Sequence, residues 1–106
     1  MAELHDLSAA ELGTAYRERR LGPVEVLREL LRHIGRWEPH LHATYALDAE
    51  AALAQAEAAQ GRWARGAPLS ALDGVPVTIK ENIATAGVPL PLGTAATELR
   101  PAAQDA

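Results

Sequence analysis

The chain has 106 residues, no cysteine and a formal net charge of -4 at pH 7. This length suits one small domain, and the missing cysteines exclude disulfides, thiolate chemistry and cysteine-ligated metal. The acidic balance argues against nucleic acid as a main partner. The acidic N-terminus is no signal peptide and no apolar run is long enough to span a bilayer, so we expect a cytoplasmic protein without membrane contact.

Two amphipathic helices are predicted first. The one over residues 8–20 begins with Ser8 and Glu11, the spacing of a capping box in which each side chain binds the other residue's backbone N–H. The second, over residues 23–37, starts with a proline, which suits the first helical position, and ends before Pro39. Its apolar residues recur at helical spacing and must be buried against something: Val26, Leu27, Leu30, Leu31 and Ile34.

A short extended segment over residues 43–47 and a helix over residues 48–65 are expected next. His40 and His42 precede the extended segment, but no third ligand is spaced to complete a metal site, so we interpret them as surface histidines. Asp48 is a suitable N-cap for the helix. One helix face consists of small residues that permit close packing, namely Ala52, Leu53, Ala56 and Ala59.

An Asp-Gly turn signal then precedes a strand predicted over residues 75–80 and a loop over residues 81–97. Val75, Val77 and Ile79 alternate along one face of that strand. A single strand cannot form a sheet, because its backbone groups need partners. We therefore expect an α/β fold, in which residues 1–106 are the N-terminal part of a single larger domain and the helices lead into the first strand of a mixed sheet.

Lys80, at the end of the predicted strand, is the only lysine beside nine arginines. On spacing alone, such a lysine most often extends to water beside the sheet. The functional alternative is an amine that is desolvated in a site, loses its proton and acts as a general base. Arginine cannot fill that role, because its guanidinium stays protonated.

The segment around Lys80 resembles the amidase signature family. That family commonly carries a stretch of the form P-L-x-G-(I/V)-P-(V/I)-x-(V/I)-K-(D/E)-N-(I/L)-x-x-x-G. Asp73 replaces a frequent histidine, Glu81 replaces a frequent aspartate, and residues 89–92 depart from the usual threonine-rich loop. The residues in register are Gly74, Val75, Pro76, Val77, Ile79, Lys80, Asn82, Ile83 and Gly87.

The resemblance implies a Ser–cis-Ser–Lys triad in which Lys80 is the catalytic lysine, neutral in the resting site. The enzyme would be a C–N hydrolase that acts on small linear amides, through an acyl-serine intermediate and without metal or organic cofactor. Both serines of the family lie downstream in glycine-serine-rich segments. This sequence has only Ser8 and Ser70, neither in such a setting, so residues 1–106 alone are predicted to be inactive.

Two alternatives stay open at the level of the sequence. The first is a non-catalytic helical interaction module, based on the apolar stripe of the second helix and the alanine face of the third. The second is a glutaminase-type amidotransferase subunit of the same family, which shares the lysine chemistry but passes ammonia to another substrate. A homodimer through the N-terminal helices is compatible with either enzyme.

Overall fold

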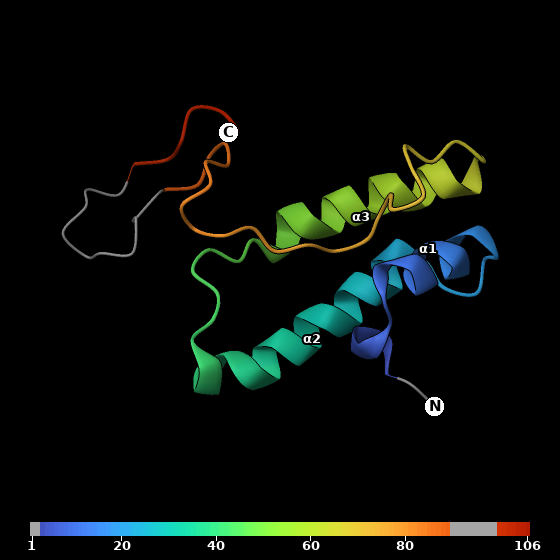
Figure 1. Ribbon diagram of the computed structural model, residues 1–106, viewed down its shortest axis with the longest axis horizontal. Coiled ribbons are helices and arrows are strands. Elements are labelled where there is room, and N and C mark those ends of the chain that lie inside the picture. The colour runs from blue at the N-terminus through green and yellow to red at the C-terminus, as the bar shows by residue number, and fades with distance from the viewer. Residues whose placement is uncertain (1–2, 90–99) are drawn as a thin grey trace. The chain divides into compact units, whose positions relative to one another are not determined.

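The computed structural model describes residues 3–89 and 100–106. They fall into two compact units, Met1–Pro76 and Val77–Ala106. The first unit contains a 3-10 helix, η1 (Leu4–Asp6), and three α-helices: α1 (Ala9–Arg17), α2 (Pro23–Leu41) and α3 (Ala49–Ala64) (Figure 1). In the described part of the chain, no helix is both long and apolar enough to cross a membrane.

The three α-helices begin where local capping chemistry places their starts. Ser8 Oγ accepts the N–H of Glu11 at 3.1 Å, and Glu11 Oε1 accepts the N–H of Ser8 at 2.8 Å, which confirms the predicted capping box. α2 starts at its proline, and Asp48 caps α3 by accepting the N–H of Ala51 at 3.0 Å. Each cap satisfies a backbone donor that lacks a partner within its helix.

The predicted end of α2 is wrong, because the helix continues through Pro39 to Leu41. A proline in the last turn removes only one backbone hydrogen bond, and the N–H of His42 still donates to the carbonyl of Glu38 at 2.9 Å. The helix stops where His42 adopts a left-handed conformation, with φ of 48°. The segment over residues 43–47, predicted as extended, is an irregular connection without strand structure.

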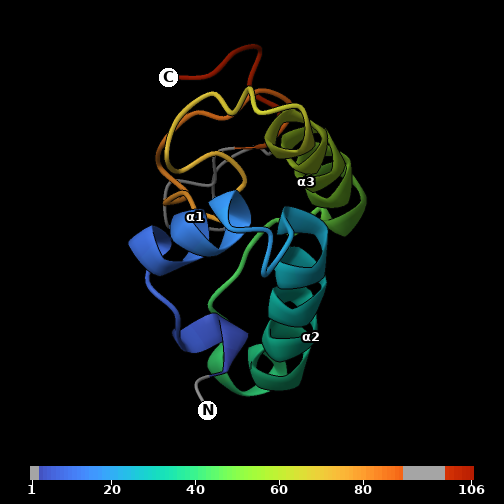
Figure 2. The same ribbon diagram turned by 90° about the vertical axis from the view of Figure 1, so that its right-hand side faces the viewer.

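The core of the first unit lies where the three α-helices meet. α3 returns beside α2, and Gln60 Oε1 accepts the N–H of Val24 at 3.2 Å, so the end of α3 lies at the start of α2. Figures 1 and 2 both show α1 beside that same end of α2. The core cluster consists of Leu12, Tyr16 and Val26. Ala56 and Ala59 are also buried, which confirms the predicted small-residue face of α3.

The strand predicted over residues 75–80 is absent from this structure. That segment is irregular, and its apolar side chains include Val77, 79% exposed, and Ile79, 56% exposed. Alternating apolar residues form a strand only when a neighbouring strand accepts their backbone hydrogen bonds, and among the described residues none pairs with this segment. Helices are therefore the regular elements of the described residues, and the larger mixed sheet stays a prediction. Residues 90–97 of the predicted loop lie outside the described residues.

Candidate functional site

Lys80 lies in the second unit, at the start of a tight turn. The N–H of Ile83 donates to the carbonyl of Lys80 at 3.0 Å, and the lysine side chain is exposed. Within residues 3–89 and 100–106, no hydrogen bond or ion pair engages its amine. The neighbouring Glu81 has one buried carboxylate oxygen without a partner in that same part of the chain. The turn therefore presents an amine that no carboxylate of the described residues neutralises.

The residues that follow the turn are held by the end of the chain. The N–H of Ala86 donates to Asp105 Oδ1 at 2.7 Å, and the N–H of Gly87 donates to the carbonyl of Ala102 at 2.8 Å. The N–H of Ala106 donates to the carbonyl of Ala84 at 2.8 Å. These bonds give residues 84–88 a defined backbone without a sheet.

The turn that precedes the lysine segment belongs to the first unit and is centred on Asp73. Arg62 binds the Asp73 carboxylate with two hydrogen bonds of 2.7 Å each, one from Nε and one from Nη2, and Asp73 Oδ2 also accepts the N–H of Leu69 at 2.9 Å. The Asp73 side chain is only 4% exposed. The hydrogen bonds from Arg62 lower the pKa of Asp73 below its usual value, so the carboxylate stays ionised.

Two aromatic side chains hold the backbone of the same turn. Trp63 Nε1 donates to the carbonyl of Asp73 at 2.8 Å, and the Tyr16 hydroxyl donates to the carbonyl of Gly74 at 3.0 Å. Burial raises the pKa of Tyr16 to about 12, with a smaller contribution from the charge of Glu25, so the hydroxyl remains a donor at neutral pH. Two successive carbonyls are thus fixed by side chains from α1 and α3.

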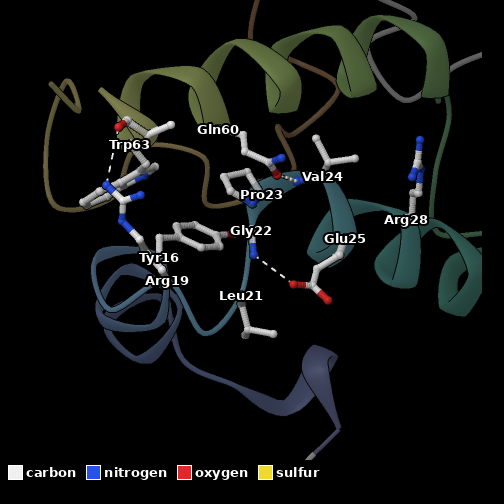
Figure 3. A pocket seen from close by; sticks show the side chains of 11 residues that line it. Tyr16, Arg19, Leu21, Gly22, Pro23, Val24, Glu25, Arg28, Gln60 and Trp63 are labelled. Atoms are coloured by element: carbon white, nitrogen blue, oxygen red, sulfur yellow. Dashed lines mark hydrogen bonds between the residues drawn. The ribbon is translucent and has the colours of Figure 1, made fainter. Parts of the chain in front are cut away.

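A surface groove of about 430 Å³ lies beside these residues, between the start of α2 and the end of α3 (Figure 3). Its polar atoms mostly bind the protein itself. Gln60 accepts from Val24, Glu25 Oε1 accepts the N–H of Gly22 at 3.0 Å, and Arg19 donates to the carbonyl of Ala64 at 3.4 Å. The groove has no serine or lysine in its wall, so we do not place the chemistry there.

Both serines and the two histidines at the end of α2, His40 and His42, have local structural roles. Ser8 caps α1, and Ser70 Oγ accepts the N–H of Leu72 at 3.1 Å. His42 ends α2, and the ring of His40 lies edge-on to that of Trp37, with ring centroids 6.2 Å apart. Across the residues that the structure describes, no three His, Cys, Asp or Glu side chains gather into a metal-binding group.

Comparison with known proteins shows to which family the chain belongs. The sequence model of the family described as Amidase matches residues 25–106, which include the whole lysine segment. The chain belongs to the amidase family. Proteins similar to it include the A-subunit of the glutamyl-tRNA(Gln) amidotransferase of Chloroflexus aggregans, which is 44% identical over 89% of this chain and 19% of its own length.

Two further relatives are A-subunits of the same kind of amidotransferase. The mitochondrial protein of Aedes aegypti is 39% identical over 77% of this chain and 16% of its own length. The protein of Salinispora arenicola is 37% identical over 89% of this chain and 19% of its own length. The chain thus spans less than one fifth of these relatives. No solved structure matches it.

The sequence predicted Lys80 as the catalytic lysine, which stays a prediction, but it did not point to the residues that hold the preceding turn. Arg62, Trp63 and Tyr16 looked like ordinary helix residues, because their partners lie 10 to 58 positions away along the chain. The one available signal was Asp73, which stands where the family often has histidine. A carboxylate before a turn glycine suggests that a cationic side chain binds it. The sequence does not show which arginine does so.

Proposed function

We propose that this chain is the N-terminal part of an enzyme that hydrolyses a carboxylic amide, with Lys80 as the base. Membership of the amidase family supports this proposal, as does the register of the lysine segment with the family pattern. The amine is exposed in residues 1–106, so the desolvation that a neutral base requires would have to come from the rest of the polypeptide. The cytoplasmic location and the homodimer stay predictions from the sequence.

In the proposed reaction, Lys80 acts on a serine pair supplied by the polypeptide downstream of residue 106. The neutral amine accepts a proton, through the serine of a cis peptide bond, from the nucleophilic serine. The serine oxygen then bonds to the amide carbon, the C–N bond breaks, and the leaving nitrogen takes the proton. Water next cleaves the acyl-serine ester, which releases the acid and restores both hydroxyls.

The test is ammonia release from L-glutamine, L-asparagine and benzamide by the full polypeptide that carries this chain. We expect Lys80→Ala to lower kcat at least about a hundredfold, because a positioned general base contributes on that order. Lys80→Arg is expected to be equally inactive, since a guanidinium keeps its proton. Arg36→Ala, which removes an exposed cation from α2, is the control and should retain activity.

Two results would contradict this proposal. Activity of Lys80→Arg close to that of the unchanged enzyme would mean that the lysine supplies only charge. Amide turnover by residues 1–106 alone, lost in Lys80→Ala, would mean that the downstream serines are not needed.

An amidotransferase component is the second candidate, and the names of the relatives favour it. Its base and acyl-serine chemistry would be the same, but the ammonia would pass to another substrate. The two candidates differ in how hydrolysis depends on a partner. A glutamine-specific activity that rises when a partner protein and an acceptor are added supports the amidotransferase, whereas broad amide hydrolysis by the isolated protein supports the amidase.

A further inference from the structure

The turn before the lysine segment is fixed more firmly than a surface turn needs to be. Asp73 is clamped by Arg62, while Trp63 and Tyr16 hold two successive carbonyls. Gly74 has φ of +82°, and a Cβ there would lie 2.7 Å from Cγ of Pro23. Contacts from α1, the start of α2 and α3 therefore determine the position and the orientation of these peptide units.

Only a short stretch of chain separates this turn from Lys80. Among the described residues, the hydrogen bonds that fix the backbone ahead of the lysine end with the N–H of Val75, which donates to the carbonyl of Leu72 at 3.0 Å. Pro76 follows, and its ring fixes one more dihedral angle. Four residues later comes Lys80, so its Cα lies within about 14 Å of that of Pro76 however the segment runs.

We propose that Arg62, Trp63 and Tyr16 are positioning residues for Lys80. They anchor Asp73 and Gly74, and this anchor sets the point from which the lysine segment enters the active site. The inference rests on the proposed function of Lys80. A lysine that relays a proton must be held within a fraction of an ångström of its partner, so a loosened anchor should lower the rate of the chemical step more than the affinity for substrate.

The chain provides matched controls for the two aromatic anchors. It has two tyrosines and two tryptophans, and one of each pair binds the turn. Tyr16→Phe removes only the hydroxyl that holds Gly74, and its control is Tyr45→Phe, at a residue 49% exposed. Trp63→Phe removes the N–H that holds Asp73, and its control is Trp37→Phe, at a residue 46% exposed.

The experiment measures kcat and KM for ammonia release by the full polypeptide, together with the folded fraction from circular dichroism. We expect Tyr16→Phe and Trp63→Phe to lower kcat about three- to tenfold each, with KM changed less than about twofold and the protein still folded. Arg62→Lys, which keeps the charge but loses the paired hydrogen bonds, should behave in the same way. Both control variants should retain the original kcat.

Three results decide between the possibilities. The inference is overturned if the anchor variants keep kcat close to that of the unchanged enzyme while Lys80→Ala is inactive, and the proposed function then survives. It is also overturned if kcat falls only in proportion to the folded fraction, since the anchor would then be structural. If Lys80→Ala itself remains active, the proposed function fails first, and the inference fails with it.

Discussion

Gly74 is the residue with the least room in the turn that precedes the lysine segment. Its φ of +82° lies in the left-handed region, which a side chain with a Cβ enters only at a cost. A Cβ at this position would also meet Pro23 at 2.7 Å and Ala59 at 3.1 Å. Two features therefore require glycine at this position of the amidase pattern: the left-handed backbone conformation, and the close contact with α2 and α3.

We expect Gly74→Ala to lower the free energy of unfolding by about 2–5 kcal/mol, the sum of the left-handed backbone cost and overpacking against Pro23. Gly66→Ala is the matched control, because φ there is +70° but no atom lies within 4 Å of the added Cβ. The control should lose only the backbone part, about 1–2 kcal/mol. Equal losses in urea unfolding would mean that contact with Pro23 does not constrain the turn.

At the scale of the elements, the helix starts could be predicted from sequence but the strand could not. The capping box of Ser8 and the cap of Asp48 join residues three apart, so the local sequence contains the whole interaction. The state of residues 75–80 depends on a partner strand that local sequence cannot provide. The clamp between Arg62 and Asp73 is also non-local, because it requires the turn to fold back onto α3.

α2 offers a prediction at this scale, because it contains a glycine at a position where packing leaves room for a larger residue. Gly35 is exposed, and no atom lies within 4 Å of an added Cβ. Glycine in a helix interior is less favourable than alanine by roughly 0.5–1 kcal/mol, because it loses more backbone freedom on folding. Gly35→Ala should therefore stabilise the helical unit by that amount, measured by urea unfolding.

The same measurement on Gly13→Ala gives the contrast within α1. Gly13 is also helical but buried, and a Cβ there would collide with the carbonyl oxygen of Ala71. We expect destabilisation in that variant. If both variants changed stability in the same direction, the close approach of α1 to the turn at residues 69–75 would be in doubt.

For the whole chain, the charge pattern predicts how stability responds to acid. The pKa values of Asp73, Glu11 and Glu38 are all lowered, by hydrogen bonds from Arg62, from the backbone of Ser8 and from the backbone of Thr44 respectively. A carboxylate with a lowered pKa stabilises the fold fully above its unfolded pKa of about 4 and loses that contribution as pH falls through its folded pKa. Only Asp73 is buried, so it should dominate.

We therefore expect unfolding free energy to change little between about pH 7 and 5, and to fall by about 2 kcal/mol below about pH 4 as Asp73 is protonated and its hydrogen bonds with Arg62 weaken. Asp73→Asn should be less stable than the unchanged chain near neutral pH by a similar amount and should show a flatter dependence in acid. Asp6→Asn, at an exposed position, should keep the original dependence. Urea unfolding followed by tryptophan fluorescence, from neutral pH down to about pH 2.5, measures all three. Parallel curves for Asp73→Asn and the unchanged chain would show that the clamp contributes nothing to acid sensitivity, and the anchor proposed for Lys80 would lose its ionic component.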